Sequence, residues 1–291
     1  MATLAVATLV PLNVRTFGRT GSTLLMQILA TDQRVCFERA YPFEHRYLSY
    51  AYHLARMVRT PVEDPSLWNN DLLFQGRSSL VGGLPYGRVD GIDTDWLSRE
   101  LFLSTWEQFS RALRRRAGLA DDVIAWYAEK APQQVADMAN DHLGARNIFL
   151  LRDPRDEMVS IKSFNERRGF NGFGWQEGDD DTSYARRLCR NRRSFLNKLR
   201  TLDTDERRIA VRYEDLVIDG PAQTGRLSDW LGVRLDYDIA TGDRAIKRQH
   251  MTSRSASASV ERWRRELGPD IQAIFRDELG EELGALGYAL D

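Results

Sequence analysis

The sequence predicts an α/β fold in which a mostly parallel central sheet carries helices on both faces. Short apolar runs of strand length alternate along the chain with longer runs of helical periodicity. The 291 residues are 42% apolar and 29% charged, which excludes a disordered or fibrous chain. No Gly-, Ser- or Pro-rich linker divides the sequence, so we expect a single domain over residues 1–291.

The elements follow in chain order. Short apolar segments with polar flanks predict strands at Val10–Thr16, Arg34–Phe37, Val123–Tyr127, Asn147–Leu151 and Arg208–Arg212. Helical periodicity or helix-start signals predict helices at Ser22–Ala30, Pro42–Val58, Asp95–Ala117, Pro132–Leu143, Pro154–Arg167, Ser183–Leu202, Glu214–Leu231, Val260–Leu267 and Asp270–Leu286. The segments 76–91 and 168–181 are expected to be irregular, and Gly220-Pro221 is expected to break a helix. Ligands of such parallel sheets bind at the carboxyl ends of the strands.

Charge and composition restrict the kinds of molecule that the protein is expected to bind. The formal net charge of −1 argues against a nucleic-acid partner. Two cysteines and four histidines without paired spacing argue against a disulfide framework and a metal site. The first residues carry Pro11 and no basic cluster, so we expect no membrane span and a cytoplasmic location. Because lysine occurs only four times, 37 of the 41 basic residues are arginines, which suit forked recognition of phosphate or sulfate oxygens.

A glycine-containing loop stands between the first predicted strand and the first predicted helix. Gly18 and Gly21 allow a tight turn in which backbone N–H groups converge on an anion. The helix that begins at Ser22 adds its positive dipole end, and Arg19 adds a permanent charge. The loop is therefore a candidate phosphate site, although an ordinary capped turn has the same sequence features.

The loop differs from that of nucleoside triphosphatases, in which a lysine follows the last glycine. Here Ser22 and Thr23 follow Gly21. Without the lysine, ATP hydrolysis is disfavoured. A small-molecule kinase and a non-catalytic nucleotide-binding protein remain alternative functions.

Further candidate residues follow later strands. Arg152 ends the strand NIFLL and opens the sequence RDPRD, and Ser160 lies eight residues further on, so both could face one oxyanion. RDPRD could equally be an aspartate cap with a salt-bridged arginine. Tyr213 follows the strand RIAVR, and Arg262 follows a Ser/Ala run that resembles a flexible flap.

Taken together and in this order, these motifs resemble the PAPS-dependent sulfotransferases, in the branch that contains bacterial and tyrosylprotein sulfotransferases. PAPS is 3′-phosphoadenosine 5′-phosphosulfate. The resemblance runs from about residue 14 to residue 267 and is strongest in RTFGRTGSTLL and FLLRDPRDEMVS. It implies a P-loop-like, three-layer α/β fold without a metal requirement.

The resemblance also implies roles for matching residues. The residues that it assigns to the 5′-phosphosulfate are Arg19, Thr20, Gly21, Ser22 and Thr23. Arg152 and Ser160 are similar to the pair that holds the 3′-phosphate, and Tyr213 and Arg262 to cofactor contacts. Lys130, in the sequence EKAP, resembles a lysine beside the transferred sulfuryl group.

Sulfuryl transfer of this kind needs charge stabilisation and a general base. Arg19 and Lys130 are suited to stabilise the negative charge of the leaving nucleotide. Glu38 is the first choice for the base, because the tyrosylprotein branch has a glutamate near this point; Glu44 is the second choice. His53 is another option, but the segment where related enzymes carry a histidine base here reads EKAPQQ.

The acceptor is not named by the sequence. A sugar, a phenolic compound, a lipid or a peptide is compatible with it, and the oligomeric state is not indicated. The loop at residues 168–181 contains Phe170, Phe173 and Trp175 between glycines and could cover a ring-bearing or sugar acceptor. A disordered surface loop is the alternative for this segment.

Overall fold

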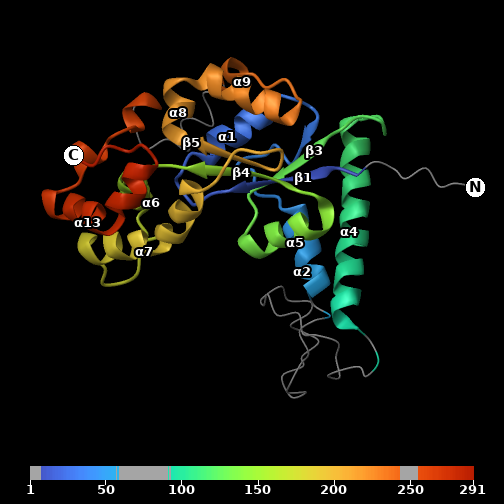
Figure 1. The fold of residues 1–291 in the computed structure, drawn as a ribbon, viewed down its shortest axis with the longest axis horizontal. Helices are drawn as coiled ribbons and strands as arrows, with labels where there is room; N and C mark the ends of the chain where they lie inside the picture. The colour runs from blue at the N-terminus through green and yellow to red at the C-terminus, as the bar shows by residue number, and fades with distance from the viewer. Residues whose placement is uncertain (1–7, 57, 59–90, 92, 243–254) are drawn as a thin grey trace, which may run out of the picture. The chain divides into compact units, whose positions relative to one another are not determined.

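The strands of the computed structural model, which describes residues 8–56, 58, 91, 93–242 and 255–291, form one sheet. They are β1 (Val10–Arg15), β2 (Val35–Cys36), β3 (Trp126–Glu129), β4 (Arg146–Leu151) and β5 (Arg208–Arg212). Their order in the sheet is β2-β3-β1-β4-β5. β3 pairs in parallel with β1 and with β2, and β4 pairs in parallel with β5 (Figure 1). The predicted α/β class with a parallel sheet is confirmed.

Helices fill the connections between the strands. They are α1 (Ser22–Leu29), α2 (Tyr47–Arg56), α4 (Thr94–Ala117), α5 (Gln133–Leu143), α6 (Pro154–Arg168), α7 (Asp181–Arg200), α8 (Tyr213–Ile218), α9 (Gly220–Leu231), α10 (Tyr237–Gly242), α12 (Trp263–Glu266) and α13 (Pro269–Ala285). A 3-10 turn, Ser257–Ser259, precedes α12. Within the described ranges, no helix combines the length and hydropathy that a membrane span requires.

Most predicted elements are confirmed, with some shifted ends. The strand at Arg208–Arg212 has the expected bounds, and the helix after residue 213 is interrupted before Gly220 as expected. The prediction of a helix over Val260–Leu267 is wrong in extent, because the backbone at Val260 is extended and only Trp263–Glu266 is helical. Of the irregular segment 76–91, all but the last residue lies outside the described residues.

The chain packs as two compact units that interleave in sequence. The first unit comprises residues 1–13, 34–38 and 44–145, and the second comprises residues 14–33, 39–43 and 146–291. β1 contributes residues 10–13 to the first unit and 14–15 to the second. Whether these two units together make the single domain expected over residues 1–291 is not tested by this division, so the single domain stays a prediction.

The core of the second unit lies where α7 and α13 pack side by side (Figure 1). Buried apolar side chains from β4, α6, α7, α12 and α13 form one cluster, in which Phe275 and Leu279 are fully enclosed. Trp263 is 1% exposed, and its ring lies 3.7 Å from the guanidinium carbon of Arg155. This core packs α6 against β4, the strand that Arg152 follows.

In the first unit, the buried carboxylate of Glu129 holds the start of α2. Its oxygens accept hydrogen bonds from the backbone N–H groups of Leu48 (2.8 Å) and Ser49 (2.9 Å). The hydroxyl groups of Ser49 and Tyr127 also donate to it. α2 begins five residues later than the sequence predicted, at the point where Glu129 supplies acceptors for its first turn. Burial raises the pKa of Glu129, and these donors oppose that rise.

We predict that Glu129→Gln lowers the free energy of unfolding by about 1–3 kcal/mol, the usual cost of unsatisfied buried donors. The glutamine amide has one acceptor oxygen and one NH₂ group, so its NH₂ group must face the donors of either Ser49 or Leu48 and leave them without an acceptor. Urea denaturation measures the loss. The matched control is Glu100→Gln, on an exposed surface ion pair with Arg99, which should stay within about 0.5 kcal/mol of wild type. Equal stability of the Glu129 variant and the wild type would contradict the anchoring role.

Candidate functional site

In the second unit, the loop that contains Gly18 and Gly21 packs against Tyr213. Gly21 has a φ of 92°, and a Cβ atom there would lie 2.1 Å from Cδ2 of Tyr213. Only glycine therefore fits, both for its backbone conformation and for the space beside it. Gly18 is restricted by space alone, because a Cβ atom there would lie 2.4 Å from Cδ1 of Phe173. The two glycines found in the sequence thus allow close packing of the loop.

Thr20 stabilises the loop, and Ser22 and Thr23 begin the helix that follows it. The Thr20 hydroxyl donates to the carbonyl oxygen of Phe17 at 2.8 Å, and Thr20 is 1% exposed. Ser22 and Thr23 lie in the first turn of α1, whose N-cap, Gly21, provides no side-chain acceptor. The N–H groups of this turn have no acceptor within the helix, so the helix start favours an anion.

Arg19 is largely buried and contacts α6. Its Nε donates to Oγ of Ser160 at 3.2 Å, and its guanidinium carbon lies 4.3 Å from the centre of the Phe164 ring. Burial, and then the charges of Arg152 and Arg167, lower the pKa of Arg19 to about 10. The guanidinium therefore remains protonated at neutral pH, in an environment that disfavours positive charge until an anion is present.

Arg152 is the centre of the site. At the end of β4, its Nη1 donates to the carbonyl oxygen of Arg19 (2.9 Å), and its Nη2 donates to that of Ser259 (2.7 Å). Its guanidinium carbon lies 4.7 Å from the ring centre of Tyr213, whose hydroxyl is 2.8 Å from Oγ of Ser259. Among the described residues, the buried Nε of Arg152 has no hydrogen-bond partner. We call Arg19, Arg152, Ser160, Tyr213 and Ser259 the Arg152 cluster.

The second part of RDPRD is a structural cap. Asp153 caps α6 by accepting from the backbone N–H of Arg155 (2.9 Å), and the two side chains form an ion pair (2.7 Å). The buried Glu214 accepts from the backbone N–H of Asp153 at 2.9 Å, and burial raises the pKa of Glu214 to about 7. The interpretation of RDPRD as an aspartate cap with a salt-bridged arginine is confirmed for Asp153 and Arg155. The role of Arg152 and Ser160 toward an oxyanion stays a prediction.

Arg262, the N-cap of α12, contacts α6 at Ser163, three residues after Ser160. Its Nη2 donates to Oγ of Ser163 (3.1 Å) and forms an ion pair with Glu266 (2.8 Å). The buried Asp156 accepts from the backbone N–H groups of Glu261 (2.7 Å) and Trp263 (2.9 Å), which fixes the turn around Arg262. Burial raises the pKa of Asp156 to about 6.

Sequence reasoning missed Ser259, Asp156 and Phe164. Ser259 stands at the end of the Ser/Ala run interpreted as a flap, yet its carbonyl and hydroxyl oxygens are both engaged in the cluster. Asp156 was visible in RDPRD, but its partners lie more than 100 residues away. No local pattern in the sequence indicates such contacts.

The other candidate catalytic residues belong to the first unit. Nζ of Lys130 lies 3.4 Å from Oε1 of Glu44, and burial lowers the pKa of Lys130. Glu129 is the last residue of β3 and pairs with Asn13 of β1. Lys130 comes directly after it and therefore lies at the carboxyl end of β3. Glu38 forms an ion pair with Arg116 at 3.0 Å. Glu44 is thus the glutamate whose carboxylate is paired with Lys130 at 3.4 Å.

The remaining sequence candidates are placed as follows. His53 lies in the last turn of α2, where its ring centre is 5.5 Å from that of Tyr52. Phe173 packs edge to face with Phe164 at 5.6 Å, whereas Trp175 stacks on Tyr184 at 4.3 Å. The aromatic residues of the loop therefore have different neighbours. In the described part of the chain, no three His, Cys, Asp or Glu side chains are grouped so as to hold a metal ion.

Comparison with known proteins identifies relatives. A family model described as "Sulfotransferase family" matches residues 11–237. Carbohydrate sulfotransferase 1 of Mus musculus is 28% identical over 163 residues, and that of Homo sapiens is 27% identical over the same length. These matches cover 51% of this chain and 40% of each relative. The solved sulfotransferase domain from the Synechococcus PCC 7002 olefin synthase has a TM-score of 0.52 at 19% identity, over 98% of this chain and 96% of that one.

Proposed function

Because the chain belongs to the sulfotransferase family, we propose that it transfers a sulfuryl group from PAPS to a hydroxyl or amine group of an acceptor. The observation that carries the proposal is the Arg152 cluster. Two buried guanidinium groups, from Arg19 and Arg152, lie beside a glycine loop and the start of a helix. Such an arrangement suits an anionic ligand, since an anion relieves the repulsion between the two cations.

The residues of the second unit fit the two charged ends of PAPS. The first turn of α1, with Arg19, would bind the 5′-phosphosulfate through N–H groups and one guanidinium. Arg152 and Ser160 would bind the 3′-phosphate, and the buried Nε of Arg152 supports this assignment because it has no acceptor among the described residues. PAPS supplies the sulfuryl group when bound and leaves as adenosine 3′,5′-bisphosphate.

Catalysis then depends on positioning and charge. Arg19 and Lys130 would stabilise negative charge on the oxygen that the sulfuryl group leaves. The lowered pKa of Lys130 agrees with a side chain that is partly shielded from water. The loss of one such donor typically lowers the rate by about 10²–10³-fold.

A carboxylate would accept the proton of the acceptor group. Glu38 is the base implied by the family resemblance. Glu44 is the second candidate, and its 3.4 Å contact with Lys130 favours it, because Lys130 is the residue implied to lie beside the sulfuryl group. Glu38 forms an ion pair with Arg116 at 3.0 Å.

For the acceptor, the names of the curated relatives support a sugar hydroxyl group. The match covers two fifths of their length, so this substrate class is part of the proposal. A kinase is disfavoured because no lysine follows Gly21. A non-catalytic nucleotide-binding protein would bind the same nucleotide without turnover.

We predict that adenosine 3′,5′-bisphosphate stabilises the protein against heat and that ATP does not. A ligand at about 100 times its Kd adds about 2.7 kcal/mol to the free energy of unfolding. Arg152→Ala should remove most of the stabilisation by the bisphosphate, because the 3′-phosphate loses its arginine. Thermal denaturation with each nucleotide measures both effects, with Arg207→Ala, an exposed arginine, as the control. Equal shifts with both nucleotides would overturn the assignment of the two phosphate sites.

A second prediction concerns the base and Lys130. With ³⁵S-labelled PAPS and an acceptor found in a saccharide screen, Lys130→Ala should lower kcat about 10²–10³-fold. Glu38→Gln should lower kcat about 10²–10⁴-fold and remove the acidic limb of the pH–rate profile. Bisphosphate affinity should stay unchanged in Glu38→Gln, because this side chain is assigned to the acceptor and not to the nucleotide.

Glu44→Gln and Glu107→Gln complete this series. Glu107 pairs with Arg111 on the surface of α4 and should have no effect. If Glu44→Gln causes the loss of the acidic limb and Glu38→Gln does not, the base is Glu44 and the assignment of Glu38 is wrong. If neither variant changes the profile, the carboxylate mechanism itself is contradicted.

A further inference from the structure

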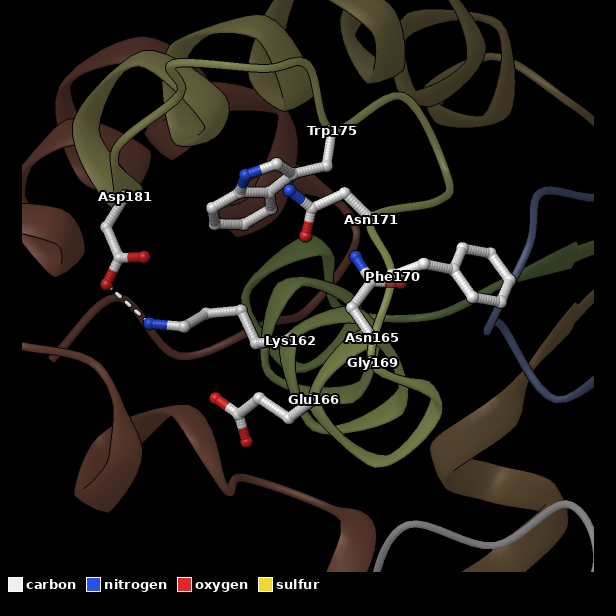
Figure 2. A pocket seen from close by; sticks show the side chains of 8 residues that line it. All are labelled: Lys162, Asn165, Glu166, Gly169, Phe170, Asn171, Trp175 and Asp181. Carbon is white, nitrogen blue, oxygen red and sulfur yellow. Dashed lines mark hydrogen bonds and ion pairs between the residues drawn. The ribbon is translucent and has the colours of Figure 1, made fainter.

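A pocket of about 320 Å³ lies in the second unit, between α6 and the loop that follows it (Figure 2). This volume is within the range of small-molecule sites. The side chains that line it include those of Lys162, Asn165, Glu166, Asn171, Trp175 and Asp181. Figure 2 shows the Phe170 ring pointing away from the other side chains, so Trp175 is the aromatic side chain that faces them.

The pocket lies on the opposite side of α6 from the Arg152 cluster. Successive helix residues are 100° apart, which places Ser160 and Phe164 on one face of α6. Lys162, Asn165 and Glu166 lie on the opposite face. Because Arg19 contacts Ser160 and Phe164, the helix separates this pocket from the candidate nucleotide site.

The walls of the pocket are held by contacts within the protein. The buried Asn165 donates through Nδ2 to the carbonyl oxygen of Gly172 (3.3 Å) and accepts from its N–H (3.1 Å). Trp175 stacks on Tyr184, whose hydroxyl donates to the carbonyl oxygen of Phe173 at 2.9 Å. The segment predicted as a lid or a disordered loop is thus held by contacts with α6, through Asn165, and with α7, through Tyr184. A ligand therefore meets a preformed surface.

The chemistry of the pocket suits a polyhydroxylated ring. Trp175 offers an apolar surface against which the C–H face of a ring can pack. The side chains of Glu166 and Asn171 make no hydrogen bond or ion pair with any residue that the structure describes, which leaves a carboxylate and an amide for hydroxyl groups. Lys162 is paired with Asp181, so the three charged groups sum to −1 and disfavour an anionic ligand.

We propose that this pocket binds one uncharged sugar unit, at a site separate from the centre of sulfuryl transfer. Trp175 would pack against the ring, and Glu166 and Asn171 would accept and donate hydrogen bonds to its hydroxyl groups. Such a site would hold a saccharide by a unit other than the one that is modified. Sugar binding here does not require PAPS or turnover, so it can be tested independently of the proposed function.

The test is saturation-transfer-difference NMR with glucose, galactose, mannose and N-acetylglucosamine, each tested separately as a probe. At least one should receive saturation from the wild-type protein, and glucuronate, which is anionic, should receive less. Trp175→Ala should weaken binding of that probe at least about tenfold. The double variant Glu166→Ala/Asn171→Ala should weaken it as well. Because these two exposed side chains lack partners among the described residues, the double variant tests the site even where Trp175→Ala disturbs the loop.

Two controls separate this pocket from other sites. Trp96→Ala removes an exposed aromatic ring of α4, which does not line the pocket, and should leave binding unchanged. A saturating concentration of adenosine 3′,5′-bisphosphate should also leave it unchanged, because α6 separates the two sites. The proposal is overturned if no probe binds, if both pocket variants bind as wild type does, or if the nucleotide displaces the sugar.

Discussion

The burial of Arg152 against backbone carbonyl groups is the constraint on which the second unit depends. Its two terminal nitrogens join the glycine loop, through the carbonyl of Arg19, to the turn at Ser259. A guanidinium loses its hydration when it is buried and must recover hydrogen bonds from the protein. Carbonyl oxygens supply those bonds without neutralising the charge, so the site keeps a net attraction for anions. The same contacts bring together segments that are more than 100 residues apart.

The carboxylates around Arg152 have hydrogen bonds of their own, and the charge of Arg152 opposes the burial-driven rise in the pKa of Asp156 and of Glu214. Asp153 and Arg155 satisfy each other, and Glu214 holds the backbone of Asp153. Asp156 is engaged with the N–H groups of the turn before α12. These carboxylates therefore stabilise the strand end and the turn through hydrogen bonds of their own. A preformed site of this kind avoids the cost of ordering its side chains when a ligand binds.

The sequence predicted the order of elements and four of the five members of the Arg152 cluster, all but Ser259, far better than it predicted their contacts. The strand ends at Arg152 and Tyr213 follow apolar runs of strand length, so local patterns located them. The contact of Arg152 with Ser259 depends on packing between distant segments, which no local pattern encodes. The late start of α2 has the same cause, since Glu129 of β3 sets it. The family resemblance suggested Glu38 as the base, and the structure pairs Glu44 with Lys130 at 3.4 Å.

The most direct test of the central claim is a crystal structure of the complex with adenosine 3′,5′-bisphosphate. The account predicts the 3′-phosphate within hydrogen-bond distance of Arg152 and Ser160, and the 5′-phosphate at the N–H groups between Arg19 and Thr23. A nucleotide bound with both phosphates at a different place, while the guanidinium of Arg152 keeps only its carbonyl partners, would contradict it.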